Sequence, residues 1–179
     1  MPGWIVASMT GRVYSRRGAA RPAAPQTGPS RPWGRCRVGA EREERGIGMS
    51  ASDIADELAA GFASAWNQHD MDGLVGLFHE DAAFVNVRGA YLKGAKEIRQ
   101  QHAAVHAGPY KHSVVRAEVV DARELAPGVI VAHVQTDLAG DDRAPGQTQR
   151  SVATFVIEQR AGLWRFTAAQ NTYVLPSTG

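Results

Sequence analysis

Four strand-like runs in the last third of the chain constrain its fold more than any other feature. They are dense in Val, Ile, Thr, Phe and Trp, the residues that are enriched in β-strands. Short polar or Gly-containing connections separate them, and such connections join antiparallel neighbours. The runs therefore predict an antiparallel sheet, built from "HSVVRAEVVDAREL", "GVIVAHVQTDLAG", "QRSVATFVIEQR" and "LWRFTAAQNTYVL".

Helical patterns precede these runs. Ser52 or Asp53 can cap a first helix, and Asp70 can cap a shorter second one. A strand "AAFVNV" follows, and a third helix begins at Lys93-Gly94 and ends at Gly108-Pro109. The first helix carries one apolar stripe, made of Ile54, Leu58, Phe62, Ala65 and Trp66.

Three helices followed by a β-meander exclude a doubly wound parallel sheet. The order predicts an α+β fold, in which a cone-shaped, strongly curved antiparallel sheet carries three helices packed on its concave face. Such a cone can leave a cavity between the sheet and the helices. We expect one domain over residues 49–179.

Residues 1–48 differ from the rest in composition. They contain nine arginines and three glutamates, a net charge of +6, whereas the remainder carries eleven basic and fifteen acidic residues, a net charge of −4. The segment is rich in Pro, Gly and Ala without apolar periodicity, which predicts a disordered extension. Three interpretations are open: an organellar transit peptide, an arm that binds polyanions, or a wrongly extended start before a true start at Met49.

Composition also excludes several classes of function. The only cysteine, Cys36, lies in the extension, so the predicted domain has no disulfide and no thiolate metal site. No run of 18 apolar residues is present, which argues against a membrane span, and a cytoplasmic protein is expected. The acidic balance of residues 49–179 argues against a nucleic-acid surface on the domain.

Three short motifs in order carry a family resemblance: "AWNQHDMDGLVGLFHEDAAFVNVRG", "LKGAKEIRQQH" and "GLWRFTAAQNTYV". Over residues 53–175 the chain resembles the nuclear transport factor 2-like superfamily, especially its SnoaL-like and SgcJ/EcaC members. The resemblance implies a cone-shaped α+β barrel that forms a homodimer through the outer face of its sheet. It also implies a cofactor-free activity, such as isomerisation, cyclisation or dehydration of a polycyclic or polyketide-like metabolite, or simple binding of such a ligand.

Asn86 marks a departure from one branch of that superfamily. Ketosteroid isomerase-like relatives carry an aspartate general base at the matching position, near the end of the first strand. An amide has no useful basicity near neutral pH, so Asn86 does not act as that base. It is either a donor on the pocket wall, on the same strand face as Phe84, or a cap of the turn at Arg88-Gly89.

The histidines are the candidate catalytic groups. His102 lies on the apolar stripe of the third helix, either as a pocket-lining group or as a core histidine. His102 and His106 have a spacing that two metal ligands can have, but no third ligand is evident and no metal is expected. In the last helical turn, His106 favours the helix dipole. His133 alternates with Gln135 and Asp137. Alternation alone leaves the direction of this polar face open: we expect it to point outward, and if it points inward, His133 and Asp137 are the acid–base candidates.

Three further side chains are candidate ligand contacts. Trp66 packs in the core and can expose part of its indole to a ligand. Simple alternation places Gln170 toward the cavity, with Trp164 and Phe166, and turns Asn171 to the outer face. The pair Asp141-Asp142 is expected to form a solvated turn. The sequence predicts a pocket for a small apolar ligand, without cofactor, metal, nucleic acid or membrane.

Overall fold

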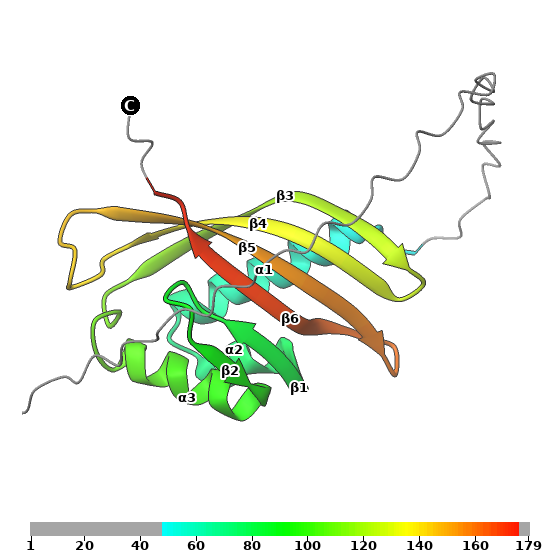
Figure 1. The fold of residues 1–179 in the computed structure, drawn as a ribbon, viewed down its shortest axis with the longest axis horizontal. Coiled ribbons are helices and arrows are strands. Elements are labelled where there is room, and N and C mark those ends of the chain that lie inside the picture. The colour runs from blue at the N-terminus through cyan, green and yellow to red at the C-terminus, as the bar shows by residue number, and fades with distance from the viewer. Residues whose placement is uncertain (1–47, 176–179) are drawn as a thin grey trace, which may run out of the picture. The chain divides into compact units, whose positions relative to one another are not determined.

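The computed structural model describes residues 48–175. The predicted extension over residues 1–48, apart from Gly48, lies outside the described residues, as do residues 176–179. The described part folds into a curved sheet with helices against its concave face (Figure 1), as the sequence predicts. Along the chain its elements are α1 (Ala51–Asn67), α2 (Met71–Gly76), β1 (Phe78–Val85), β2 (Tyr91–Lys93), α3 (Gly94–His106), β3 (Val114–Ala126), β4 (Val129–Ala139), β5 (Thr148–Arg160) and β6 (Leu163–Tyr173).

The sheet has the strand order β2-β1-β6-β5-β4-β3. Strands β3 to β6 form the predicted antiparallel meander, and β2 pairs antiparallel with β1. The neighbours β1 and β6 run parallel, with Phe84 opposite Ala169, so the sheet is mixed at this one point. The parallel pairing places Val85, the last residue of β1, opposite Gln170 on β6. The candidate residues Asn86 and Gln170 therefore lie close to each other.

A capping box starts α1 two or three residues earlier than the sequence suggests. Ser50, rather than Ser52 or Asp53, is the N-cap, and its Oγ accepts a hydrogen bond from the backbone N–H of Asp53. The Asp53 carboxylate in return accepts from the Ser50 backbone N–H at 2.9 Å. The predicted apolar stripe is confirmed, because Ile54, Leu58 and Trp66 are buried against the sheet.

Strand β2 was missing from the sequence-based prediction. It is three residues long, and its pattern is exposed, buried, exposed, so the single buried side chain, Leu92, gives no periodic signal. The strand leads directly into α3. Gly94 sits at φ 78°, and a Cβ atom there would stand 3.1 Å from the carbonyl oxygen of Glu80, so the close entry to α3 requires glycine.

The core lies between the concave face and the helices. Each strand of the meander contributes alternate apolar side chains to it, which is the period of two that a sheet with one buried face requires. No helix of the described part has the length and apolar character that crossing a membrane demands. The buried apolar residues of the central strands are Ile130, Ala132, Val134, Ala153, Phe155, Ile157, Phe166 and Ala169.

Candidate functional site

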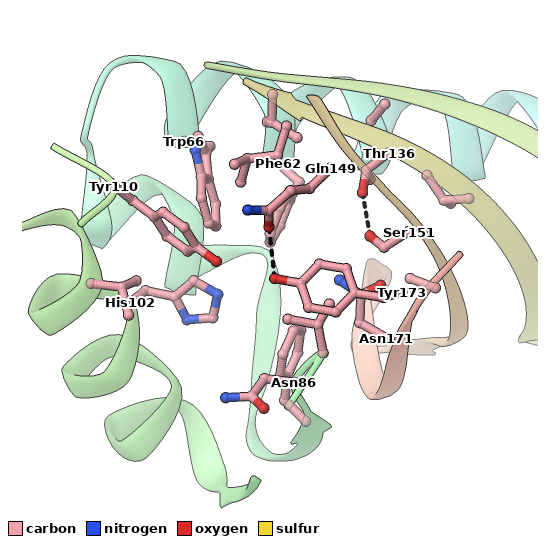
Figure 2. A pocket seen from close by; sticks show the side chains of 18 of the residues that line it. Phe62, Trp66, Asn86, His102, Tyr110, Thr136, Gln149, Ser151, Asn171 and Tyr173 are labelled. Atoms are coloured by element: carbon pink, nitrogen blue, oxygen red, sulfur yellow. Dashed lines mark hydrogen bonds between the residues drawn. The ribbon is translucent and has the colours of Figure 1, made fainter. Parts of the chain in front are cut away.

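A cavity of about 120 Å³ lies between α1, α3 and the inner face of the sheet. Figure 2 shows its side chains, which converge from both helices and from the strands β4, β5 and β6. Aromatic and aliphatic groups form most of the wall, and polar groups from α3, from the turn after β1 and from strands β4 to β6 lie among them. The apolar lining comprises Ala59, Phe62, Trp66, Phe84, Val87, Val105, Val115, Ala117, Val134, Leu138, Ala153 and Phe155.

His102 lies in this wall and is 6% exposed. Its Nδ1 donates a hydrogen bond to the Ile98 carbonyl oxygen at 2.7 Å, one turn earlier in α3, which leaves the Nε2 lone pair free. Burial among aromatic rings lowers the pKa of His102, and the Ile98 carbonyl opposes this shift less strongly. His102 is therefore neutral at neutral pH. Trp66 and Phe84 contact its ring edge-on, with centroids 5.9 and 5.4 Å away.

Trp66 fulfils both roles that the sequence allows. Its indole is buried, and Nε1 donates to the hydroxyl of Ser113 at 3.0 Å, which ties α1 to the segment before β3. The same ring lines the cavity. Because its polar atom already has a partner, Trp66 offers a ligand only an apolar face.

Asn86 lies at the rim of the cavity and also caps the turn. Its Oδ1 accepts from the backbone N–H of Arg88 at 2.9 Å and of Ala90 at 3.0 Å. The two interpretations of this residue are therefore compatible, since the oxygen holds the turn while the side chain borders the cavity. Phe84, two residues earlier on β1, lines the cavity as predicted.

The predicted orientation of the β6 pair is wrong. Gln170 is exposed and lies outside the cavity lining, whereas Asn171 lines the cavity. A β-bulge is the cause. Pairing with β5 passes from Phe166–Ile157 to Ala168–Val156, so Thr167 has no partner residue and the alternation changes phase. Beyond the bulge, Ala169 and Asn171 share the inner face.

His133 lies on the outer face, as the favoured interpretation of β4 predicts. Its side chain is 41% exposed, and its Nδ1 is 3.8 Å from the carboxylate of Asp121 on β3. The apolar alternation of Ile130, Ala132 and Val134 occupies the inner face instead. His133 therefore does not line the cavity and cannot act on a ligand bound there.

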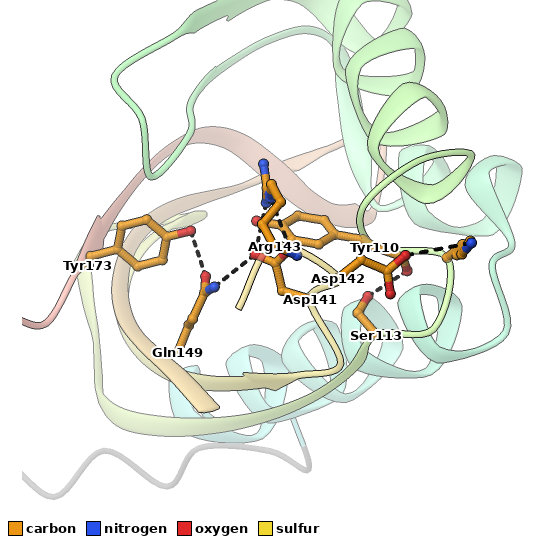
Figure 3. Close-up of polar contacts among 8 residues, drawn as sticks. Tyr110, Ser113, Asp141, Asp142, Arg143, Gln149 and Tyr173 are labelled. Carbon is orange, nitrogen blue, oxygen red and sulfur yellow. Dashed lines mark hydrogen bonds and ion pairs between the residues drawn. The ribbon is translucent and has the colours of Figure 1, made fainter. Parts of the chain in front are cut away.

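A polar network at the cavity's end was missed by the sequence-based prediction (Figure 3). Asp141 is not a solvated turn residue, because it is only 2% exposed. Its carboxylate accepts from the Arg143 backbone N–H, from Arg143 Nε and Nη2, and from Gln149 Nε2, at distances of 2.8–3.0 Å. These bonds, above all those from Arg143, lower the pKa of Asp141 to about 2. Asp142, its neighbour, is exposed as predicted.

Two tyrosines complete this network. The Tyr173 hydroxyl donates to Gln149 Oε1 at 2.8 Å, and the Arg143 guanidinium lies over the Tyr110 ring, 4.8 Å from its centroid. Burial first, and then the adjacent Tyr110 hydroxyl, raise the pKa of Tyr173 to about 12. Tyr173 is thus protonated at neutral pH. Both hydroxyls point toward the middle of the cavity in Figure 2.

Two arginines, Arg88 and Arg143, line the cavity, and within the described residues only Arg143 has a carboxylate partner. The positive charge of Arg143 is paired with the carboxylate of Asp141, which itself does not line the cavity. Among the described residues that do line it, none is an aspartate or a glutamate. In the part of the chain that the structure covers, no three His, Cys, Asp or Glu side chains are grouped as a metal site would require.

His106 is not among the residues that line the cavity, and it is not charged at the helix end. It is 8% exposed, and its Nδ1 lies 2.6 Å from Nδ1 of His69. Burial, followed by the neighbouring imidazoles of His69 and His102, lowers the pKa of His106 to about 4. It is therefore neutral at neutral pH, and the interaction with the helix dipole that the sequence suggested is absent.

Together these features define a small α+β cone with a partly open, mostly apolar cavity. The SnoaL-like domain family model matches residues 59–167, and the chain belongs to this family, within the nuclear transport factor 2-like superfamily. Membership of the narrower SgcJ/EcaC branch stays a prediction. No curated protein matches the chain.

Solved structures show the same fold. An uncharacterized protein with a cystatin-like fold from Caulobacter vibrioides is 26% identical, with a TM-score of 0.64 over 70% of this chain and 91% of that one. A domain of unknown function from Nostoc punctiforme is 23% identical, with a TM-score of 0.64 over 71% and 79%. A ketosteroid isomerase-like protein from Erwinia carotovora atroseptica is 12% identical, with a TM-score of 0.59 over 69% and 95%.

Proposed function

We propose that this chain binds a small, mostly apolar metabolite in the cavity between its helices and its sheet. The observation that carries the proposal is the cavity itself, walled mostly by aromatic and aliphatic side chains with a smaller number of polar groups among them. This is the usual composition of a small-molecule site.

The cavity volume selects the size of the ligand. A dry protein cavity of about 150 Å³ holds one benzene ring, and this cavity measures about 120 Å³. The inner part of the cavity therefore matches a single ring, and a larger scaffold would extend through the open side. The polar end formed by Tyr110, Gln149 and Tyr173 accommodates its oxygen-bearing substituents.

The chemistry of the wall favours binding over proton abstraction. No lining residue within the described part carries a carboxylate, and the position at the end of β1 holds the amide of Asn86. Arg143 is paired with Asp141, whereas Arg88, which also lines the cavity, has no ion pair among the described residues. These groups suit a neutral ligand, or one with an anionic substituent beside Arg88.

A second function rests on His102. Its Nε2 lone pair is free and its ring lines the cavity, so it is the group in this wall that can accept a proton from a bound ligand near neutral pH. A cofactor-free isomerase or dehydratase would use it as general base. The lowered pKa makes it a weak base, for which reason binding is the first proposal.

Native mass spectrometry of the protein purified from its own host tests binding directly. A copurified small molecule supports the proposal, and the same spectrum shows whether the chain forms the homodimer that the resemblance implies. Binding of 4-fluorophenol, followed by ¹⁹F NMR, provides a test with a defined probe. Ala117→Leu fills the cavity and should abolish binding, whereas His133→Ala, on the outer face, should leave it unchanged. If Ala117→Leu, still folded, binds the probe as before, the cavity is not the site.

The two functions are separated by His102→Gln. As a binding protein, the variant retains its ligand, and no turnover exists to be lost. As an enzyme, the wild type converts the copurified ligand, and the variant loses at least about a hundredfold in rate while it still binds, since general base catalysis contributes about 10²–10⁴-fold.

A further inference from the structure

Arg88 is a cationic side chain that lines the cavity and has no ion pair. It is exposed, and within the described residues no carboxylate lies at ion-pair distance from it. The other lining arginine, Arg143, is paired with Asp141. Residues 49–179 carry eleven basic and fifteen acidic residues, yet none of the described lining residues is acidic. The cavity therefore has one uncompensated positive charge in a domain that is negatively charged.

The turn after β1 holds the backbone of Arg88 in place. The Arg88 backbone N–H donates to Asn86 Oδ1 at 2.9 Å, and the Gly89 N–H donates to the Asn86 carbonyl oxygen, also at 2.9 Å. The Asn86 N–H in turn donates to the Ala90 carbonyl oxygen at 3.0 Å. All these bonds involve the backbone of Arg88 and its neighbours, so the turn fixes where the side chain starts and leaves its guanidinium available to a ligand.

Arg88 lies on the side of the cavity where β6 ends. In the parallel pairing Val85 is opposite Gln170, so the turn that follows β1 continues beside Tyr173, the last residue of β6. Electrostatics agree with this placement, because burial is the main cause that raises the pKa of Tyr173 and the positive charge of Arg88 opposes the rise. Since Tyr173 lines the cavity, the charge of Arg88 also acts on a ligand group bound at that side.

We infer that the ligand carries a carboxylate, which Arg88 binds at the rim while the apolar ring of the ligand occupies the inner cavity. This deepens the proposed function and rests on it. A guanidinium binds a carboxylate through two parallel N–H···O bonds, and one ionised carboxylate matches one unpaired charge. The ligand class that fits is a single apolar ring with a short, carboxylate-bearing side chain, whose acid group lies toward the open side of the cavity.

Two fluorinated probes that differ in charge measure this preference. 4-Fluorophenylacetate is an anion at pH 7, whereas 4-fluorophenylacetamide is neutral and has nearly the same shape. ¹⁹F NMR gives the Kd of each, and the ratio of the amide Kd to the carboxylate Kd cancels the shared burial of the ring. The wild type should prefer the carboxylate. In Arg88→Gln the ratio should fall about fivefold, which corresponds to about 1 kcal/mol, the upper value for an exposed ion pair.

Two variants and a change of salt provide the controls. Arg123→Gln removes the same charge from an exposed arginine on β3 that does not line the cavity, and it should leave the ratio unchanged. Arg88→Lys keeps the charge and should retain the preference for the carboxylate, which separates charge from packing. The wild-type ratio should also decline between about 0.01 M and about 1 M NaCl, because salt screens an exposed pair. Thermal unfolding of each variant shows that it is folded.

The outcomes distinguish the inference from the proposed function. If 4-fluorophenol binds the wild type but the ratio in Arg88→Gln stays within about twofold of the wild-type value, the inference is wrong while the cavity remains a binding site. Binding of 4-fluorophenylacetate that persists in Ala117→Leu also overturns the inference, because the carboxylate would then bind Arg88 without a ring in the cavity. If no probe binds the wild type, the proposed function fails and takes the inference with it.

Discussion

Asp141→Asn should destabilise the domain strongly although it replaces one atom in a surface loop. The carboxylate is 2% exposed and accepts four hydrogen bonds, three of them from Arg143. Asparagine keeps one acceptor oxygen, which can retain the two bonds at Oδ1. Its amino group replaces Oδ2 and then faces two donors, Arg143 Nη2 and Gln149 Nε2.

The magnitude follows from these lost bonds. A hydrogen bond to a charged group contributes about 1.5–3 kcal/mol, so two of them set an upper range of about 3–6 kcal/mol. The Arg143 side chain is 37% exposed and can turn toward water, which reduces the expected loss to about 2–3 kcal/mol. For a domain of this size that corresponds to about 10 °C in Tm.

Urea unfolding at pH 7 measures the loss, and Asp142→Asn serves as control. Asp142 is exposed, and its carboxylate lies 3.6 Å from Lys111 Nζ, so its variant should lose less than about 1 kcal/mol. The pKa of Asp141 is about 2 in the folded protein and about 3.9 in an unfolded chain. Its contribution is therefore complete above pH 4 and disappears as the pH falls through 2, and the difference between wild type and variant should shrink over that interval. Equal, small losses in both variants would refute the network.

Two other predictions concern the loops and helix ends around the cavity. The pKa of His106 is about 4 in the folded protein and about 6.5 in the unfolded chain. The free energy of unfolding should therefore fall as the pH drops from 6.5 to 4, by about 1–2 kcal/mol after a discount for solvent screening. His106→Phe should flatten this slope in urea unfolding, and an unchanged slope would contradict the assignment. Gly140→Ala should cost more than about 2 kcal/mol, because its Cβ would stand 2.4 Å from the His112 carbonyl oxygen at a φ of 78°. Gly146→Ala, also at positive φ but with open space around its Cβ, should cost only about 1 kcal/mol; equal losses in thermal unfolding would show that the contact with His112 does not matter.

The fold could be predicted from the sequence because its signals are local and repeated. Each strand of the meander alternates apolar and polar residues, and each connection contains its own turn residues. The orientation of β4 followed from the same logic: the apolar set of Ile130, Ala132 and Val134 takes the core, which forces His133 outward. Strong periodicity favours this orientation, since a shift of the strand by one residue would expose the whole apolar set.

The same logic failed on β6 for a physical reason. Thr167 is an extra residue in the pairing, and nothing in "FTAAQN" marks it, because small and polar residues on both sides tolerate either orientation. The alternation then places Gln170 outward and Asn171 inward. A bulge is decided by the two strands that pair, so the sequence of one strand does not reveal it.

The burial of Asp141 also could not be predicted from the sequence, because it depends on contacts between loops that are distant along the chain. The Asp142 backbone N–H donates to the Pro109 carbonyl oxygen, and Gly140 packs against His112, which together hold the loop after β4 over the segment after α3. An acidic residue two positions before an arginine is the one local signal of the pair. It cannot distinguish a solvated turn from a buried ion pair that borders a cavity.

Position 86 shows how the same fold can carry different chemistry. The turn after β1 needs an oxygen that accepts from two backbone N–H groups, and Asn86 Oδ1 provides it. An aspartate offers the same oxygen, so the turn alone does not distinguish the two residues. What differs is the charge at the rim of the cavity, where an aspartate would face the lining residue Arg88, which has no ion pair among the described residues. With the amide at position 86, the described wall stays free of carboxylates, so the position that serves as a base in other members of the superfamily here only holds the turn and borders the cavity.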